Sequence, residues 1–298
     1  MIYTNYYNLP KSLTDVIDNI TYDITLNDPN RFSATSLIQT PRIRQLTIRH
    51  WNEIEDDYSN HIWQITGNAF HYILAKTKKE NRQIEQKIEI KLDDYLIVNK
   101  PDLYDEETKT IEDWKVTSVF AVKSVKKDWE QQLNCYDWSL EKIGFKPEKM
   151  VINAILRDWS ETEFKRYKKD YPPIPFKQIE IPIWTFEQQN QFILDRISIH
   201  KIAEKLNDKE LPLCSPEERW ATEEKWAVYK NKNIRATKLL DSETKAKRYT
   251  NKCNKNVKND KFYYKKREGL DLRCIKYCTC NHFCSYYLSK YSHNEKTT

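Results

Sequence analysis

The stretch YLIVNKPDLYDEETKTIEDWK, residues 95–115, decides the fold of the chain. Two β-rich runs, 95–102 and 108–115, lie on either side of an acidic turn and predict two adjacent strands. Because side chains alternate along a strand, Asp113 and Lys115 share one face, and the neighbouring strand can place Asp102 beside them. Two carboxylates and an ammonium at one point are suited to hold Mg²⁺ or Mn²⁺ and to stabilise charge on a phosphoryl oxygen.

Helices and strands are predicted around this stretch. Apolar residues at near-helical spacing, from Ile62 to Leu74, predict a helix over 61–79, and alternation predicts a strand at 88–92. A second apolar stripe predicts a helix over 129–143 that Gly144 closes. Strands follow at 150–156 and 177–184, and a capping box formed by Thr185 and Gln188 opens a helix to about residue 206. This order predicts a mixed α/β fold with helices that flank a central sheet.

Two motifs on the predicted helices add polar groups. Gly67 stands four residues before His71, where it would let another backbone approach the same helical face. His71 would be a nitrogen ligand that favours Mn²⁺ or a transition ion, although a lone helical histidine is more often a packed or surface residue. Gln132 and Tyr136 share a helical face and would hold Lys115 or a phosphate, and Tyr136 equally fits the apolar stripe as a core residue.

The acid-x-Lys pattern alone carries little information, because it recurs at Glu85, Glu89, Glu107, Glu163, Glu223 and Glu243. An ordered set of four motifs is more specific: Gly67-x3-His71, Pro101-Asp102, Asp113-x-Lys115 and Gln132-x3-Tyr136. This set resembles the PD-(D/E)xK nuclease superfamily, and within it the RecB-like branch that includes the CRISPR-adaptation exonucleases. The resemblance covers roughly residues 33–205, and segments 129–138 and 154–159 are similar to phage and prophage members.

The resemblance implies a restriction-endonuclease-like central mixed sheet and a metal-dependent DNA nuclease, with an exonuclease expected. It implies a site of catalytic residues and ligands for Mg²⁺ or Mn²⁺: Asp102, Asp113, Lys115, Gln132 and Tyr136 for catalysis, and His71, Asp102 and Asp113 for the metal. An upstream glutamate, either Glu85 or Glu89, would assist. Asn99-Lys100 departs from the family pattern, because many relatives have a glycine before the Pro-Asp motif.

Only three of the 298 residues are glycine, namely Gly67, Gly144 and Gly269. They are too far apart to build a P-loop or a dinucleotide-binding loop, so the chain is not itself an ATP-driven motor. A separate helicase or recombinase would then have to supply unwound DNA. Codon bias in an A/T-rich genome would also make glycine rare, but the exclusions hold for either cause.

Positive charge is concentrated near the C-terminus. Residues 206–298 contain 21 Lys and Arg against 12 Asp and Glu, a net charge of +9, whereas the whole chain carries +6. This segment predicts a basic module over 207–298, after a nuclease core at 1–206. Basic residues with interleaved tyrosines suit a phosphate backbone, although a solvated lysine-rich surface has the same composition. The candidates for DNA binding are Lys245, Lys247, Arg248, Lys265, Lys266 and Arg267.

Local signals predict the elements of this module. Ser215, Pro216 and Glu218 fit the first positions of a short capped helix. Two runs, 225–230 and 234–240, predict a hairpin, and Asp241 or Ser242 is expected to start another helix.

Four of the seven cysteines lie between residues 274 and 284, which in a reducing compartment favours metal ligation over disulfides. Three of these with one remote cysteine resemble the iron–sulfur staple of several RecB-like nucleases, which implies a [4Fe-4S] cluster on Cys214, Cys274, Cys278 and Cys284. The helix predicted after Cys214 would stabilise its thiolate. The alternative is a zinc site on Cys274, Cys278 and Cys284 with Cys280, His282 or Cys214 as the fourth ligand. Cys135 is expected to be inert core, and Cys253 a bystander.

No apolar run approaches the roughly 20 residues that cross a bilayer, and residues 1–13 lack the apolar stretch of a signal peptide. We therefore expect a cytoplasmic protein of a bacterial cell or a phage-infected host, with DNA as its partner. The main hypothesis is a Mg²⁺- or Mn²⁺-dependent deoxyribonuclease in DNA recombination, repair or phage DNA processing. The rival hypotheses are an inactive nucleic-acid-binding adaptor of the same fold and a zinc-module regulator that binds proteins.

Overall fold

A computed structural model describes residues 1–19, 28–77, 79–256 and 260–291. The chain divides into two compact units, Met1–Leu211 and Pro212–Thr298. The boundary expected from the sequence lies after residue 206. Among the helices of the described residues, none has both the length and the apolar character that a membrane span requires.

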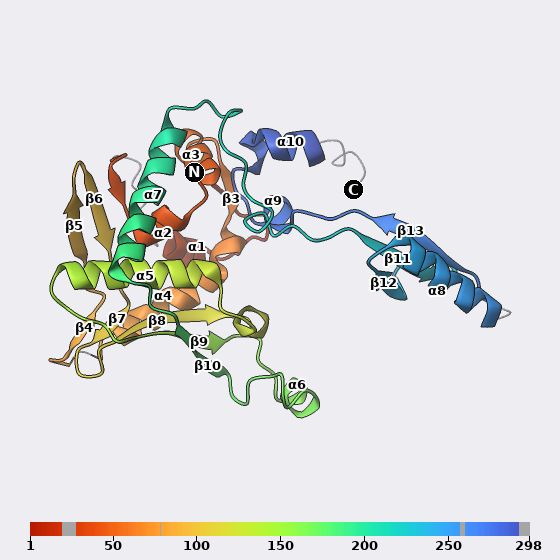
Figure 1. The fold of residues 1–298 in the computed structure, drawn as a ribbon, viewed down its shortest axis with the longest axis horizontal. Helices are drawn as coiled ribbons and strands as arrows, with labels where there is room; N and C mark the ends of the chain where they lie inside the picture. Colours follow the sequence, from red (N-terminus) through yellow and green to blue (C-terminus); the bar gives the residue numbers. More distant parts are fainter. Residues whose placement is uncertain (20–27, 78, 257–259, 292–298) are drawn as a thin grey trace. The chain divides into compact units, whose positions relative to one another are not determined.

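The first unit is built on a five-stranded mixed sheet in the order β10-β9-β8-β7-β4 (Figure 1). Strands β8 and β9 run parallel, and the other neighbouring pairs run antiparallel. The five strands are β4 (Arg82–Ile84), β7 (Leu103–Asp105), β8 (Thr110–Thr117), β9 (Lys149–Leu156) and β10 (Phe176–Ile181). Helices flank the sheets, so the predicted mixed α/β class is confirmed, as is the strand predicted at 150–156. The strand predicted at 177–184 is present but ends at Ile181, three residues before the predicted end.

Helix α5 (Lys127–Lys142) lies between two hydrophobic cores, and ten of its sixteen residues are buried. Its residues Trp129 and Leu133 pack with the central sheet, whereas Tyr136 and Trp138 belong to a second core. Gly144 closes the helix with a φ of 97°, and the next residue returns its N–H to the carbonyl of Leu140 at 3.0 Å. This is the glycine C-cap that the sequence predicts.

The second core is covered by a three-stranded sheet in the order β2-β6-β5, made of β2 (Arg31–Phe32), β5 (Ile88–Leu92) and β6 (Tyr95–Asn99). Helices α2 (Ala34–Ile38) and α7 (Phe186–Glu204) supply Leu37, Ile193 and Ile197 to it. The predicted capping box is present at the start of α7, where Thr185 and Gln188 bond reciprocally. The first unit also contains β1 (Ile2–Thr4), α1 (Lys11–Asp18), α3 (Pro41–Arg49), β3 (Glu55–Asp57), η1 (Tyr58–His61), η2 (Val119–Val122) and α6 (Glu161–Arg166).

The run 95–102, predicted as one strand beside that of 108–115, forms a shorter strand in the other sheet. Strand β6 ends at Asn99 in the small sheet, and β7 starts at Leu103 in the central sheet, where it pairs with β8. The break falls at Pro101, which has no N–H to donate. Asn99 fixes the other side of the break: its buried amide donates to the Cys135 carbonyl at 3.0 Å and accepts from the Ala34 N–H at 2.7 Å. Asp102 therefore lies in the link between the two sheets.

Helix α4 (Ile62–Leu74) is shorter and more exposed than its apolar pattern predicts. It ends five residues before the predicted end, and Leu74 is its one buried residue. Ile62 and Ile73 are exposed. The expected close approach of a backbone at Gly67 is wrong, because a β-carbon there would meet no atom within 4 Å.

The second unit contains a three-stranded antiparallel sheet in the order β12-β11-β13, packed against helix α8 (Glu243–Asn256) (Figure 1). The strands are β11 (Lys225–Lys230), β12 (Lys238–Leu240) and β13 (Phe262–Arg267). Pairing of β11 with β12 confirms the predicted hairpin, and Ser242 accepts the Lys245 N–H at 3.3 Å, which confirms the predicted start of α8. Three short helices complete the unit: α9 (Leu272–Lys276), η3 (Asn281–Phe283) and α10 (Ser285–Tyr291).

The short helix predicted after Cys214 is wrong, because residues 216–220 form turns. The predicted cap contacts are nevertheless present. The Ser215 N–H donates to the Glu218 carboxylate at 2.7 Å, and the Glu218 N–H donates to Ser215 Oγ at 3.1 Å. The reciprocal bonds thus stabilise a turn, so the α-helical dipole expected beside Cys214 is not present.

Candidate active site

His71, Glu85 and Asp102 form the one group of three or more potential metal-ligating side chains that the structure brings together among its described residues. One ligand atom from each lies within 4.8 Å of the other two. His71 Nδ1 is 3.2 Å from Glu85 Oε1 and 3.6 Å from Asp102 Oδ1. The set joins the end of α4, the turn after β4 and the link before β7, three segments that are separate in sequence.

Glu85, not Glu89, belongs to this group. Glu85 has a positive φ of 52°, which turns the chain directly after β4, and its N–H donates to the Asp102 carbonyl at 3.1 Å. The Lys100 ammonium forms an ion pair with the Glu85 carboxylate. Glu89 instead lies on β5 and pairs with Lys87 at the surface. The alternative that the sequence leaves open is therefore decided by backbone geometry.

Asp113 and Lys115 point to the same face of β8, as their alternation predicts. Lys115 Nζ lies 2.8 Å from Asp113 Oδ2 and donates to Oδ1 at 3.1 Å. Asp113 is completely buried, and Asp102 lies close by, with its Oδ2 accepting the Trp114 N–H at 2.7 Å. Trp114 points to the opposite face of the strand and packs on Phe70 of α4.

Gln132 and Tyr136 continue this polar chain into α5. Lys115 donates to Gln132 Oε1 at 3.3 Å, and the Gln132 amide donates to the Tyr136 hydroxyl at 2.7 Å. Both side chains are buried. Gln132 therefore contacts Lys115 directly, whereas Tyr136 contacts Gln132 and is a core residue.

Burial and crowding disturb the ionisation of the carboxylates. Burial first, and the nearby Asp113 carboxylate second, raise the pKa of Asp102 to about 7. Burial also raises the pKa of Asp113, although Lys115 opposes the rise. Contact with Glu85 and the charge of Asp102 raise the pKa of His71. The raised pKa values mean that the positive charges of Lys115 and His71 do not fully balance the two carboxylates. A bound cation would supply the remaining positive charge.

Unsatisfied atoms point to the same conclusion. Asp113 Oδ2 and His71 Nδ1 are buried, and within the described chain they have charged neighbours but no well-aligned hydrogen bond. A carboxylate oxygen and an imidazole nitrogen are ligand atoms that Mn²⁺ accepts, and carboxylate oxygens suit Mg²⁺. The residues present therefore fit a divalent cation. Asp113 stands apart from the group of three because it is turned toward Lys115.

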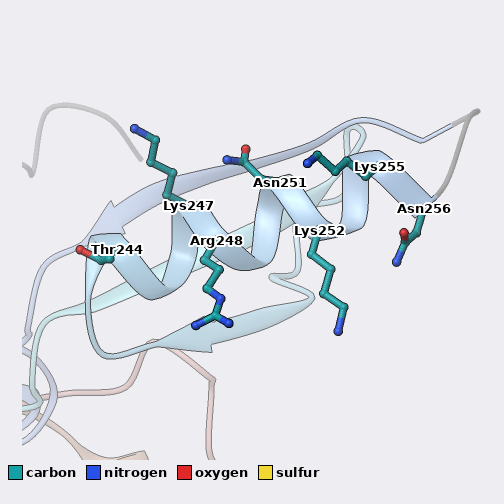
Figure 2. A pocket seen from close by; sticks show the side chains of 7 residues that line it. All are labelled: Thr244, Lys247, Arg248, Asn251, Lys252, Lys255 and Asn256. Atoms are coloured by element: carbon teal, nitrogen blue, oxygen red, sulfur yellow. The ribbon is translucent and has the colours of Figure 1, made fainter.

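The predicted DNA-binding residues do not form one surface. Lys245 pairs with Asp241 at 3.8 Å, and Lys266 pairs with Glu224 at 2.8 Å. Lys265 lies over the Tyr263 ring at 5.8 Å on β13, where Arg267 is also exposed. Lys247 and Arg248 project instead from the outer face of α8, where they line a shallow pocket (Figure 2). Lys252 and Lys255, which belong to the basic stretch but not to the predicted set, line the same pocket.

The four predicted cysteine ligands are close enough to influence one another. Burial first, then Glu218 and the thiols of Cys278, Cys274 and Cys284, raise the pKa of Cys214 to about 12. Burial and the neighbouring thiols raise the pKa of Cys274 to about 11. The expected stabilisation of the Cys214 thiolate is therefore wrong for the metal-free protein. Crowded thiols that resist ionisation fit a cationic metal or cluster, because it would remove their mutual repulsion.

Cys278 and Cys280 differ from the other thiols. Their sulfurs are 3.6 Å apart, and this contact lowers the pKa of Cys278 to about 7. Among the described residues no three cysteine sulfurs lie within 4.8 Å of one another. A tetrahedral zinc with Zn–S bonds of about 2.3 Å would place every pair of its four sulfurs about 3.8 Å apart. In an iron–sulfur cluster each thiolate binds a different iron, which requires wider spacing.

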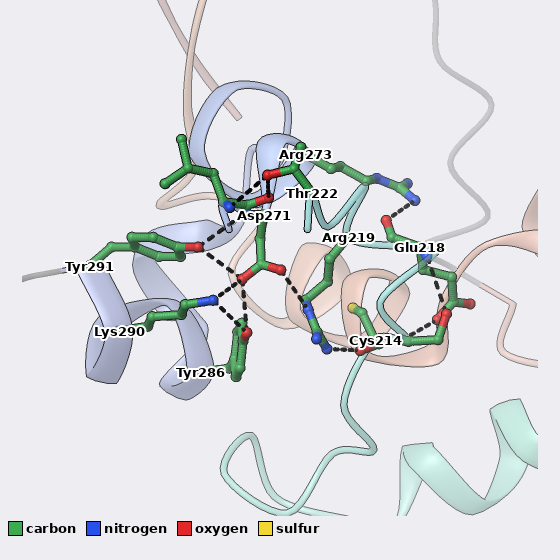
Figure 3. Close-up of polar contacts among 11 residues, drawn as sticks. Cys214, Glu218, Arg219, Thr222, Asp271, Arg273, Tyr286, Lys290 and Tyr291 are labelled. Carbon is green, nitrogen blue, oxygen red and sulfur yellow. Dashed lines mark hydrogen bonds and ion pairs between the residues drawn. The ribbon is translucent and has the colours of Figure 1, made fainter. Parts of the chain in front are cut away.

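Asp271 joins the segments that carry these cysteines (Figure 3). It is 2% exposed and accepts hydrogen bonds from Arg219 at 3.1 Å, Tyr286 at 2.8 Å, Lys290 at 2.9 Å and Tyr291 at 2.9 Å. Arg219 also donates to the Cys214 carbonyl, Asp271 directly precedes the helix of Cys274, and the other three partners follow Cys284. The sequence reasoning missed this hub, although its position directly before a helix is a signal that could have found it.

A close backbone contact supports the same region. A β-carbon on Gly269 would lie 2.1 Å from the Thr222 carbonyl oxygen, so only glycine fits there. The Thr222 N–H donates to the Leu270 carbonyl at 2.9 Å, and the Leu270 N–H donates to Thr222 Oγ1 at 2.9 Å. These contacts therefore join the segments that carry Cys214 and Cys274.

Comparison with known proteins gives distant structural similarity and no sequence relative. No protein-family model and no curated protein matches the chain. The crystal structure of SSO0001 is 18% identical over 63% of this chain and 82% of its own, with a TM-score of 0.37. A phage-related exonuclease from Haemophilus somnus 129PT is 12% identical over 65% of this chain and 87% of its own, with a TM-score of 0.33. At these scores neither structure adds to what the site geometry shows.

Proposed function

We propose that the chain is a metal-dependent deoxyribonuclease that hydrolyses phosphodiester bonds. The observation that carries the proposal is the convergence of His71, Glu85 and Asp102 with the buried Asp113–Lys115 pair. Acidic side chains with raised pKa values, beside an ammonium that two partners hold in place, form a site that needs both a cation and a polyanionic substrate. Resemblance of the four sequence motifs to RecB-like nucleases supports the same class.

The residues divide the chemistry between them. His71, Asp102 and Asp113 would hold Mg²⁺ or Mn²⁺, with Glu85 beside them, and the ion would act as the Lewis acid for the phosphate. Lys115 would donate to the phosphate as negative charge develops there or orient the attacking water. Gln132 and Tyr136 are buried behind Lys115. We therefore assign them to positioning the ammonium, in place of the direct contact with DNA that the resemblance implies.

The test of catalysis is cleavage of linear and closed circular DNA with Mn²⁺ or Mg²⁺, by the native chain and by Asp113→Asn. We expect the native chain to degrade linear DNA, and the variant to be slower by about a hundredfold or more. Preference for linear over circular substrate would support an exonuclease. A variant that cuts at the native rate would overturn the site assignment, and salt-sensitive binding of DNA by the native chain without cleavage would establish the adaptor alternative.

The metal site has its own matched test. Mn²⁺ binding is measured by calorimetry on Glu85→Gln and on Glu89→Gln, two variants that remove the same carboxylate charge from neighbouring positions. We expect weaker binding only for Glu85→Gln, because Glu89 lies at the surface with Lys87. Equal affinity of both variants and the native chain would remove Glu85 from the site.

For the second unit we propose a structural [4Fe-4S] cluster on Cys214, Cys274, Cys278 and Cys284. The absence of any three described cysteine sulfurs within 4.8 Å favours the cluster over zinc. Anaerobically purified protein is expected to be brown, with about four iron atoms per chain. Colourless protein with one zinc atom per chain would establish the zinc alternative, on Cys274, Cys278, Cys284 and one of Cys280, His282 or Cys214.

A further inference from the structure

Helix α8 presents a cationic face that no described carboxylate neutralises. Its outward residues are Thr244, Lys247, Arg248, Asn251, Lys252, Lys255 and Asn256 (Figure 2). Within the described chain Lys247, Arg248, Lys252 and Lys255 have no ion-pair partner, whereas the lysines that border the helix, such as Lys225 and Lys245, pair with Asp241. Residues 244–256 contain no acidic residue.

This face differs from an ordinary solvated helix surface. On α6 the cations Lys165 and Arg166 pair with Glu161 and Glu163 of the same helix. Four unpaired cations on four turns of helix repel one another and so weaken the helix. A polyanion would relieve this repulsion, and binding would release its condensed counterions.

The cations lie in two rows along the helix, with an amide side chain in each (Figure 2). One row contains Lys247, Asn251 and Lys255, and the other contains Arg248, Lys252 and Asn256. The first and last positions of each row are eight residues apart, which corresponds to about 12 Å along the axis. An α-helix with its side chains is about 10–12 Å wide and fits the major groove of B-DNA, which is about 12 Å wide. Cations on both flanks would then reach the phosphates of both strands.

The aromatic residues of the unit do not support binding to a single strand at this face. Base stacking requires exposed rings beside the cations, and the outward face of α8 has none. Tyr263 stacks on Tyr229 at 5.4 Å, and Tyr264 packs edge-on against Trp226. Tyr263 and Tyr264, which are interleaved with lysines in the sequence, therefore pack within the sheet of the unit.

We infer that the outer face of α8 is a docking surface for double-stranded DNA, entered through the major groove and bound through backbone phosphates. The surface is separate from the proposed catalytic residues, so it holds whether or not the first unit cuts DNA. Asn251 lies between the cations, where its amide would face base edges. Recognition is otherwise independent of sequence, because lysine and arginine contacts to phosphate carry no sequence information.

The test is equilibrium binding of the full chain to a short duplex, without added divalent cation so that no cleavage intervenes, over a range of salt concentrations. Four phosphate contacts predict a slope of about −3.6 in log affinity against log salt. Lys252→Ala/Lys255→Ala should reduce the magnitude of the slope by about 2. The control Lys225→Ala/Lys230→Ala removes the same charge from two lysines that are paired with carboxylates, and should leave the slope nearly unchanged.

Three results would overturn the inference. One is an equal loss of slope in the control, which would mean that net charge alone attracts the duplex. Another is equal affinity for single-stranded DNA of the same length, and the third is equal affinity for double-stranded RNA, whose major groove is too deep and narrow for a helix. Circular dichroism of each variant checks that α8 remains folded. If the native chain cleaves DNA and Lys252→Ala/Lys255→Ala binds the duplex as tightly as the native chain, the docking surface is wrong and the nuclease proposal still stands.

Discussion

The two regions that carry unusual charge handle it in opposite ways. In the first unit Asp102, Asp113 and Lys115 are gathered beneath the surface, and each has a charged neighbour within the protein. On α8 in the second unit the cations are exposed and have no described partner. Buried charge that is matched internally sets up chemistry at a point, whereas exposed charge without a partner is available to a large ligand. We therefore propose a catalytic role for the first region and a binding role for the second.

The largest effect is expected from Lys115→Met, which removes the ammonium between Asp113 and Gln132. Loss of a charge that stabilises the developing transition state should slow Mn²⁺-dependent DNA cleavage by about a thousandfold, with little change in DNA binding. Lys109→Met is the matched control, because Lys109 directly precedes β8, the strand of Lys115, and forms a surface ion pair with Glu148. If both variants keep the native rate, the buried pair has no catalytic role.

A smaller effect is expected from Asp271→Asn, which tests whether the second unit also depends on a buried charge. Arg219 and Lys290 would lose their buried anionic partner, so the free energy of unfolding of this unit should fall by about 3 kcal/mol. Hydrogen exchange in denaturant measures the unit within the full chain. Asp260→Asn, which breaks an exposed pair with Lys230, should cost much less. Equal stability losses would contradict the assignment of Asp271 as a hub.

The two units should respond to pH with opposite sign. The pKa of Asp102 is raised from 3.8 to about 7, so the unfolded chain releases this proton at a lower pH than the folded chain. Asp102 therefore makes the first unit less stable as pH rises between about 4 and 7. Hydrogen bonds from Lys290, Tyr286, Tyr291 and Arg219 outweigh burial and lower the pKa of Asp271 to about 2, so the second unit loses stability as pH falls from about 4 toward 2. Hydrogen exchange resolves the two units. The first slope should become smaller in Asp102→Asn and when Mn²⁺ is bound, but it should persist in part, because burial also raises the pKa of Asp137 in this unit to about 6.

The smallest effect is expected at the glycines of the first unit. Gly67→Ala should stabilise α4 by about 0.5–1 kcal/mol, because the added methyl group meets open space and alanine favours helix. Gly144→Ala should destabilise by about 1 kcal/mol, because the residue must adopt a positive φ. Thermal unfolding measures both. A destabilising Gly67→Ala would mean that a ligand or partner approaches this face of the helix.

The local elements of the first unit could be predicted from sequence because short-range patterns determine them. The strand alternation around Asp113, the apolar stripe and glycine cap of α5, and the capping box at Thr185 all involve residues within a few positions of one another. The ion pair of Asp113 with Lys115 follows from alternation alone. Proximity of His71 to Asp102 was expected only from the order of the motifs, and the structure brings the two side chains together.

The remainder depends on contacts between distant segments. Pro101 was visible in the sequence, but the division of its neighbours between two sheets depends on Asn99, whose partners Ala34 and Cys135 lie far away in the chain. Selection of Glu85 over Glu89 depends on a single positive φ. The distribution of the C-terminal lysines between paired and unpaired positions depends on where Asp241 and Glu224 fall in the fold. None of these three outcomes can be predicted from the spacing of residues in the sequence.

The position of α5 between the two hydrophobic cores has a consequence for how the sequence of such a protein would evolve. Gln132 and Tyr136 are buried and hydrogen-bonded to each other, and Tyr136 packs in the second core, so their loss would weaken folding as well as the proposed catalysis. Asp113 and Lys115 differ, because replacing a buried ion pair by apolar residues is often neutral or stabilising. In a lineage released from cutting DNA, the pair on the strand would decay first while the helix motif persisted. An intact strand pair is therefore the better record of selection for chemistry.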